Sequence, residues 1–226
     1  MNFDFMDKYY MFFLNGAKAT LILSILTVLF GVVLGMVVAM MRMSRFSVLR
    51  YIAVAYIEVI RGTPLLVQLY IIYYGLPKLG IQFPEIPAIS SSFPDFMAGV
   101  VALSINSAAY VAETFRAGIQ AIDKGQMEAA RSLGMPQSMA MRFIIWPQAF
   151  RNVLPALGNE FIVIIKESSI VSVIGISELM YSADTVRGNT AQPFEPLIVA
   201  AVIYLIMTLT LSKLLGVAER RMKTSD

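Results

Sequence analysis

Five long apolar runs, separated by more polar segments, divide the 226 residues of this chain. A helix that crosses a bilayer needs about 20 mostly apolar residues. The pattern therefore predicts an all-α integral membrane protein with a single transmembrane domain over residues 1–226. The five predicted transmembrane helices cover residues 18–42, 50–75, 96–117, 152–176 and 196–217, and a long polar loop covers residues 118–151.

The composition agrees with a membrane protein and narrows its chemistry. Hydrophobic residues make up 58% of the chain, charged residues make up 15%, and the mean hydropathy is +0.70. Soluble domains carry about 25% charged residues. Cysteine and histidine are both absent, which excludes disulfides, cysteine-ligated metals and the commonest catalytic base. We therefore expect neither a metal site nor catalytic residues.

The N-terminal segment does not resemble a cleaved signal peptide, because Asp4 and Asp7 stand where such a peptide is basic. Apolar and aromatic residues at helical spacing in residues 2–14 predict a short amphipathic helix at the membrane surface. A frayed tail with aromatic anchors at the interface explains the same residues equally well.

Lysines and arginines are distributed unevenly among the polar segments. Twelve of the 18 lie in residues 42–50, in residues 116–151 or near the C-terminus, and only four lie in the remaining polar segments. Basic loops of membrane proteins stay in the cytoplasm. The polar loop and the C-terminus are therefore predicted to be cytoplasmic and the N-terminus to be outside. Five spans also require termini on opposite sides, so the two arguments agree.

This orientation leaves residues 76–95 and 177–195 as outer loops. Proline fixes φ and lacks an amide donor, so the first loop is predicted to be a stiff, non-helical cap. Both loops are candidates for contact with an extracytoplasmic partner, although simple connectors would show the same pattern. The prolines of the first loop are Pro77, Pro84, Pro87 and Pro94.

The polar loop contains a short predicted helix. Asp123 can cap its N-terminus, and Gly134 followed by Pro136 can end it. Small side chains at Ala129 and Ala130 on one flank would let another backbone approach closely. Taken alone, these features also fit an ordinary amphipathic loop helix.

A longer spacing pattern includes this helix. Glu128-Ala129-Ala130 is followed by Gly134, Ile144 and Pro147, and this pattern resembles the cytoplasmic loop of ABC-transporter permeases. Trp146 departs from the general pattern, which has leucine before the proline, but it keeps bulk and apolarity. Other segments are similar to those of the polar amino-acid uptake permeases, which include histidine, glutamine and arginine importers. These segments are residues 58–64, 112–116, 147–149, 158–162 and 166–169.

The resemblance implies a type I ABC importer-like permease in the bacterial inner membrane. In that family the loop forms a coupling helix that docks on an ATPase subunit, which assigns coupling to Glu128, Ala129, Ala130 and Gly134. The chain has no Walker A pattern, so ATP and Mg are expected on a separate ATPase and no cofactor in this chain. The implied partners are an identical or related permease, two ATPase subunits, an extracytoplasmic substrate-binding protein, an amino acid and membrane lipid, but no nucleic acid.

Charged residues inside the predicted spans need an explanation, because each costs at least ~2.5–3.5 kcal/mol at the bilayer centre. Glu58 and Arg61 are three residues apart and can pair on one helix face. Pro64 creates a kink there and frees the carbonyl of Ile60 for local polar groups. An ion pair at a kink is the favoured interpretation, and a substrate-lining role for Glu58 is the alternative.

Two further sets of polar residues lie in the third and fourth spans. Glu113 and Arg116 predict a salt bridge at the end of the third span. In the fourth span, Glu160 shares one face with polar neighbours, and this face should point into the protein. Lys166 and Glu167 can satisfy each other, whereas Glu160 has no partner on its own helix. The residues predicted to contact substrate are Glu160, Asn159, Asn106 and Glu58.

Acidic groups facing one cavity would favour a basic amino acid through charge-assisted hydrogen bonds. One glutamate can also hold the α-ammonium group of any amino acid, so a neutral substrate such as glutamine stays open. An inter-helix salt bridge or a buttress at the subunit interface would equally explain Glu160. The alternative function is a stand-alone channel or secondary transporter, which would leave the Glu-Ala-Ala loop unused. A membrane-embedded enzyme is disfavoured by the missing histidine and cysteine.

Overall fold

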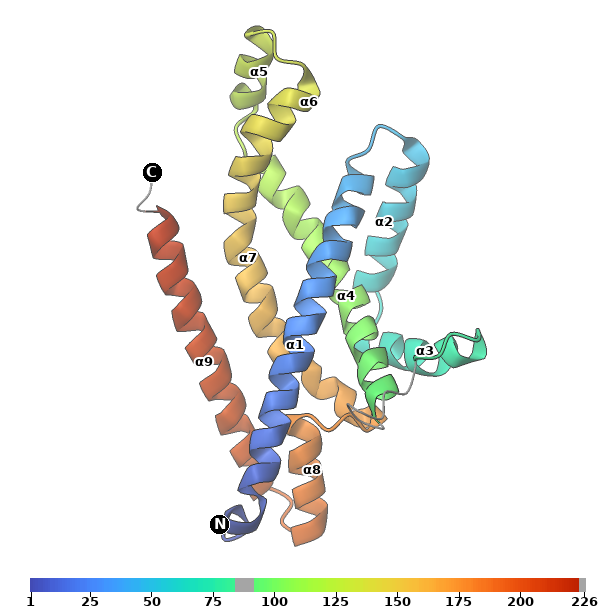
Figure 1. Ribbon diagram of the computed structural model, residues 1–226, viewed down its shortest axis with the longest axis vertical. Helices are drawn as coiled ribbons and strands as arrows, with labels where there is room; N and C mark the ends of the chain where they lie inside the picture. The colour runs from blue at the N-terminus through green and yellow to red at the C-terminus, as the bar shows by residue number, and fades with distance from the viewer. Residues whose placement is uncertain (84–91, 224–226) are drawn as a thin grey trace.

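The computed structural model describes residues 1–83 and 92–223 (Figure 1). Every regular element in these two ranges is helical, as the apolar runs predict. In chain order the elements are α1 (Met6–Arg42), α2 (Ser47–Arg61), α3 (Leu65–Lys78), α4 (Phe93–Gln120), α5 (Lys124–Ser132), α6 (Gln137–Ala140), the π-helix η1 (Met141–Ile145), α7 (Trp146–Glu167), the 3₁₀-helix η2 (Ser168–Ile174), α8 (Leu179–Thr190) and α9 (Glu195–Lys223).

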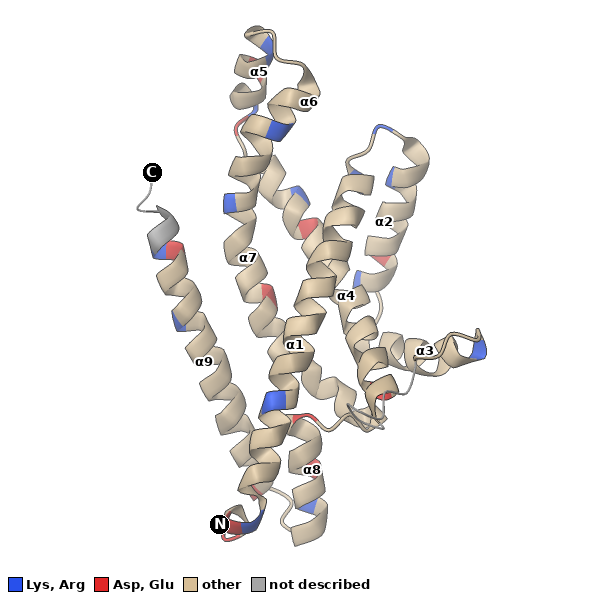
Figure 2. Ribbon diagram, viewed as in Figure 1, with Lys and Arg blue, Asp and Glu red and all other residues tan. Residues whose placement is uncertain are grey.

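Helix α1 runs along the middle of an elongated molecule and packs most extensively on α4 (Figure 1). It also contacts α2, α7 and α8, while α9 packs on α7 and α8. Helices α5 and α6 form one end of the long axis, and α8 and the N-terminus lie at the opposite end (Figure 1). Lysines and arginines gather toward the half that carries α5 (Figure 2).

A row of small side chains lets α1 approach its neighbours closely. Small residues at every fourth position are a common packing surface of membrane helices, because lipid gives no hydrophobic drive for association and close packing must supply it. At Gly31 and Gly35 the space that a Cβ would need is occupied by Ser107 and Val111 of α4. The small residues in this buried row are Gly16, Thr20, Ser24, Thr27, Gly31, Gly35 and Ala39.

Substituting Gly35 with alanine is expected to lower the stability of the folded protein. The new Cβ would lie 2.6 Å from Val111 Cγ1 and 2.9 Å from the Ala108 carbonyl oxygen, which belongs to the α4 backbone. Overpacking of this kind costs about 1–3 kcal/mol. Thermal unfolding of the purified protein in detergent measures the change. Gly188→Ala on α8 is the matched control, since nothing lies within 4 Å of its Cβ position. Equal unfolding temperatures for the two variants would contradict close α1–α4 packing.

The second predicted span is broken, because α2 and α3 meet at an angle of 109°. Gln68 holds this bend, since its Nε2 donates to the carbonyl oxygens of Ile60 at 2.7 Å and Thr63 at 3.0 Å. The kink predicted from Pro64 is therefore present, and a local polar group satisfies Ile60 as expected. The predicted ion pair between Glu58 and Arg61 is wrong: within the described ranges no ion pair joins them, and both side chains are exposed.

Three described helices, α1, α4 and α9, are long and apolar enough to cross a membrane, and the bent pair α2–α3 adds a fourth if it counts as one span. Helix α7 has 22 residues but carries four charged side chains. The amphipathic segment predicted at residues 2–14 is mostly the first part of the continuous α1. The predicted fourth span, 152–176, changes from α-helix to 3₁₀-helix after Glu167.

The two segments that the sequence predicts to be outer loops, 76–95 and 177–195, contain more helix than expected. Pro77 lies inside α3 and Pro94 in the first turn of α4, so the idea of a wholly non-helical first loop is wrong at both ends. Proline is accepted in a first helical turn because that amide has no intrahelical acceptor. Pro84 and Pro87 lie outside the described residues. The segment 177–195 contains α8, which packs on α1 and α9.

Candidate functional site

Glu160 of α7 points at α4, in the middle of the helical bundle. Its Oε1 accepts a hydrogen bond of 2.8 Å from Ser107 Oγ, and the side chain is only half-buried. Ser107 is fully buried and lies against Gly31 of α1. The Ser107 hydroxyl is thus held in place. The Glu160 carboxylate can still accept hydrogen bonds from a further donor. The inter-helix salt bridge considered for Glu160 is not found among the described residues.

Asn106 precedes Ser107 on α4 and leads to the bend between α2 and α3. Its Nδ2 donates to Gln68 Oε1 at 2.8 Å, and only 5% of Asn106 is exposed. Gln68 Nε2 in turn donates a hydrogen bond of 2.8 Å to Thr63 Oγ1. A continuous polar path therefore runs from the bend to Asn106, beside the Ser107 that holds Glu160. The sequence indicated Asn106 and Glu160 but not their hydrogen-bond partners, Gln68 and Ser107.

The other two predicted substrate residues lie outside this hydrogen-bonded path. Glu58 on α2 and Asn159 on α7 are both exposed. Lys166 and Glu167 line an open hollow of about 530 Å³ together with Leu65 at the start of α3. No direct ion pair joins Lys166 and Glu167 in the described part of the chain.

Glu113 forms the ionic contact between α1 and α4. It pairs with Arg116, whose Nε donates to Glu113 Oε1 at 2.7 Å, and also with Arg42 of α1. The first of these pairs confirms the salt bridge expected from spacing. The second was not predicted, because it joins residues 71 positions apart. The carboxylate is therefore shared between two guanidinium groups on neighbouring helices.

The predicted helix in the polar loop is present as α5. Asp123 Oδ1 accepts from the Gly125 amide at 2.6 Å, which is an N-terminal cap. Gly134 ends the helix in the left-handed conformation with φ +84°, which glycine adopts without steric cost. Glu128 and Ala129 are exposed, whereas Ala130 is buried within the chain. Residues on one flank of α5 are therefore free to contact another protein.

The second half of the motif joins α5 to the bundle. Ile144 lies in the π-helix η1 and Pro147 in the first turn of α7. Trp146 packs against Phe115 of α4, with ring centroids 6.2 Å apart. A displacement of α5 would therefore be transmitted to α7, the helix that carries Glu160.

Glu178 is a buried carboxylate that sequence analysis did not single out. The residue is 0% exposed, and its side chain caps α8 by accepting from the amides of Met180 at 2.9 Å and Tyr181 at 2.7 Å. It also accepts from the hydroxyl of Tyr204 on α9 at 2.7 Å and from that of Thr20 on α1 at 3.4 Å. One side chain therefore links three helices. The only signal in the sequence is an acidic residue just before a helix start.

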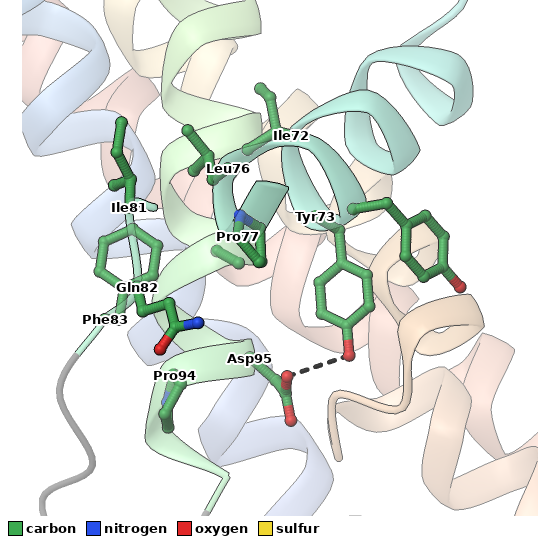
Figure 3. A pocket seen from close by; sticks show the side chains of 11 residues that line it. Ile72, Tyr73, Leu76, Pro77, Ile81, Gln82, Phe83, Pro94 and Asp95 are labelled. Carbon is green, nitrogen blue, oxygen red and sulfur yellow. Dashed lines mark hydrogen bonds between the residues drawn. The ribbon is translucent and has the colours of Figure 1, made fainter. Parts of the chain in front are cut away.

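A pocket of about 730 Å³ lies between α3 and the start of α4 (Figure 3). Most of its lining is apolar, and Tyr73 donates a hydrogen bond of 3.0 Å to Asp95 at its edge. None of the four predicted substrate residues lines this pocket. The pocket is therefore separate from the residues predicted to contact substrate.

A polar path inside an apolar helical bundle and an exposed, capped helix at one end define a membrane transport subunit. The chain matches the family of binding-protein-dependent transport system inner membrane components over residues 31–224. It therefore belongs to this family and is a multi-pass protein of the inner membrane, as the resemblance in the Glu-Ala-Ala loop predicts.

Relatives cover nearly the whole chain. The arginine transport system permease protein ArtQ of Bacillus subtilis (strain 168) is 44% identical over 216 residues, which are 95% of this chain and 94% of that protein. The putative glutamine transport system permease protein GlnP of Rickettsia typhi is 42% identical over 221 residues, covering 96% of this chain and 97% of that protein. These relatives are named as permeases, not as enzymes.

Solved structures share the fold. In the crystal structure of an amino acid ABC transporter with histidines, a chain 55% identical to this one matches with a TM-score of 0.88, covering 98% of this chain and 100% of that chain. A chain of the methionine ABC transporter MetNI, in an inward facing conformation, is 18% identical with a TM-score of 0.77, covering 98% and 99%. The second match concerns the fold alone. The fold is that of a type I ABC importer permease.

Proposed function

We propose that this chain is the permease subunit of an ATP-driven importer for basic or other polar amino acids. The observation that carries the proposal is α5, an exposed and capped helix placed at one end of a family-typical transmembrane bundle. Its motif residues link α5 to α7, and α7 carries the half-buried Glu160. Movement of a docked ATPase would therefore be transmitted through α5 and α7 to Glu160. This movement would expose the substrate site alternately to the two sides of the membrane.

Five spans cross the membrane in this proposal: α1, the bent pair α2–α3, α4, α7 and α9. The N-terminus is outside, and α5 and the C-terminus are in the cytoplasm. The basic residues near α5 (Figure 2) and the termini toward opposite ends (Figure 1) support this orientation. The expectation that the polar face of α7 points into the chain is wrong, because Asn159, Lys166 and Glu167 are exposed and Glu160 is only half-buried. In this proposal that face lies against the second permease or the transport pathway and not against lipid.

The assembly would contain a second permease, identical or related, and two ATPase subunits that bind ATP and Mg. An extracytoplasmic binding protein would deliver the amino acid. The family name itself refers to such a binding protein. Coupling to the ATPase would depend on Glu128, Ala129, Ala130 and Gly134. Glu128 and Ala129 are exposed for contact, Ala130 packs within the chain, and Gly134 ends the helix. No cofactor is proposed for this chain.

Glu160 is proposed to hold the cationic group of the substrate. Asn106, which precedes the Ser107 bound to Glu160, and the exposed Asn159 and Glu58 are proposed as further substrate contacts. A carboxylate that accepts from Ser107 retains sites for an ammonium or guanidinium donor. Both arginine and glutamine carry an α-ammonium group, so the relatives named for either amino acid are consistent with this role.

The test is uptake into proteoliposomes that contain the permease with its ATPase partners. Wild-type uptake of labelled arginine or glutamine is expected to require ATP hydrolysis and to continue when ion gradients are collapsed. Glu160→Gln is expected to weaken substrate affinity by roughly 10- to 100-fold, because a charge-assisted hydrogen bond becomes a neutral one. Glu219→Gln at the far end of α9 is the charge-matched control.

Two results would contradict the proposal. Uptake driven by an ion gradient without ATP would identify a stand-alone channel or secondary transporter instead. ATP-driven uptake with unchanged affinity in Glu160→Gln would keep the importer but exclude this glutamate as a substrate ligand and return it to the role of a structural buttress.

A further inference from the structure

A π-helical turn interrupts the long helix that connects α5 to the bundle. Helix α6, the π-helix η1 and α7 follow one another without a break over residues 137–167 (Figure 1). The amide of Trp146 donates to the carbonyl oxygen of Met141, five residues back, whereas an α-helix bonds four residues back. The π turn therefore contains one residue more than a regular α-helix would, and this extra residue sets how α5 and α6 are rotated relative to α7.

Pro147 gives a reason for the wide turn at this position. Proline has no amide to donate, and inside an α-helix its ring clashes with the carbonyl group four residues back, which here belongs to Phe143. Widening the turn separates the two groups. The next residue, Gln148, compensates for part of the lost bonding, since its Nε2 donates to the carbonyl oxygen of Ile144 at 2.9 Å. A residue with an amide at position 147 would allow a continuous α-helix instead.

The burial of side chains along this helix follows the π geometry. Ala140, Ile145, Ala149 and Val153 are buried, so the spacing is five residues across the π turn and four residues after it. In a regular α-helix, residues five apart point about 140° away from each other, and Ile145 would leave the buried face. Burial is an observation separate from the backbone hydrogen bond, and it shows that the fold depends on the extra residue.

We propose that Pro147 is a positioning residue for coupling, because it maintains the π turn that directs α5 toward the ATPase. This inference rests on the proposed function and concerns the orientation of the docking helix. Helix α7 is held in the bundle by α4, while α5 contacts η1. Loss of the π turn would rotate α5 by about 100° around the axis of α7, which is the angle of one residue. The exposed flank with Glu128 and Ala129 would then turn away from the ATPase.

Two measurements separate orientation from transport. The chain contains no cysteine, so spin labels attach only to cysteines introduced at two exposed positions, Lys124 on α5 and Val48 on α2. The distance between the labels in the purified permease reports the orientation of α5. Coupling is measured in proteoliposomes with the ATPase subunits, as the amount of arginine or glutamine taken up per ATP hydrolysed.

Pro147→Ala is expected to shift the label distance, since the new amide can donate to the carbonyl of Phe143 and close an α-turn. Uptake per ATP should fall by roughly tenfold or more, as expected when a docking contact is lost. Deleting the exposed Arg142 from this variant is expected to restore both values. The deletion shortens the spacing from Ala140 to Ile145 to four residues, so that a regular α-helix returns Ile145 to the buried face.

Pro136→Ala is the matched control. Pro136 is the N-cap residue of α6 and precedes the continuous helix, where an amide has no intrahelical acceptor. The label distance and the uptake per ATP should therefore stay at the wild-type values. If Pro147→Ala does not fold, the variant that also lacks Arg142 decides the matter. Wild-type values in that variant support the inference, and failure to fold or to couple contradicts it.

Three further results would overturn the inference. An unchanged label distance in Pro147→Ala would mean that another part of the chain holds the π turn. A shifted distance that the deletion of Arg142 does not restore would exclude the extra residue as the cause. Normal uptake despite a shifted distance would show that coupling does not depend on this orientation. Absence of ATP-driven uptake by the wild type would instead contradict the proposed function, and the label distances would still test the π turn.

Discussion

Replacing Ala129 with arginine is expected to abolish most ATP-driven uptake while the permease itself still folds. Ala129 is exposed on α5, so the new side chain meets solvent in the isolated chain. In the proposed assembly α5 docks on the ATPase, and an arginine in place of the alanine methyl group would hold the two proteins apart. Overpacking of this kind costs about 1–3 kcal/mol, which corresponds to roughly 5- to 150-fold weaker association.

Uptake into proteoliposomes and co-purification of the ATPase subunits measure this effect. Ala218→Arg is the control, because Ala218 is also an exposed alanine in a helix near the proposed cytoplasmic end. Binding of arginine or glutamine by the permease should survive in both variants, since Glu160 is untouched. Normal uptake in Ala129→Arg would show that α5 is not the docking helix, and the importer mechanism proposed for this chain would lose its main support.

Replacing Glu178 with alanine is expected to cause a large loss of stability at the end of the bundle that carries α8 and the N-terminus (Figure 1). The variant removes the acceptor for two α8 amides and for the hydroxyls of Tyr204 and Thr20. Each buried donor left without an acceptor costs about 1–3 kcal/mol. Allowing some donors to rearrange, the total loss should be about 3–5 kcal/mol.

The loss is measured as a lower unfolding temperature in detergent. Asp184→Asn on the same helix serves as control, because Asp184 pairs with Arg187 at the surface and these side chains are 38% and 45% exposed. Exposed pairs contribute about 0–1 kcal/mol, so this variant should unfold close to the wild type. A Glu178→Ala protein as stable as Asp184→Asn would mean that the contacts with α1 and α9 contribute nothing to the fold.

The polar path was only partly predictable because its members are far apart in the chain. Glu160 and Asn106 were recognisable as polar residues in apolar runs, which is a local signal. The partners Ser107 and Gln68 are small or neutral and occur in many helices without any such role. Which residue faces which depends on how α3, α4 and α7 cross, and each bond joins residues from different helices.

The fate of Arg61 illustrates the same limit. The three-residue spacing to Glu58 correctly describes neighbours on one helix, and such neighbours can pair. In the folded chain the aromatic face of Tyr110 competes for the guanidinium, and Arg61 lies over that ring while Glu58 stays exposed. The competitor is 49 positions away, so only packing of α2 against α4 decides the outcome.

The sequence by itself determined the membrane class, the apolar helices, the bend at Pro64, the capped helix α5 and membership of the transport family. Each of these depends on signals within a few residues: apolar length, a proline, an aspartate cap, a glycine stop or a fixed motif spacing. The tertiary structure alone decided the burial of Glu178, the close α1–α4 packing, the second partner of Glu113 and the position of Arg61 over the ring of Tyr110. These depend on contacts between helices, whose energies favour one arrangement only after the helices have packed together.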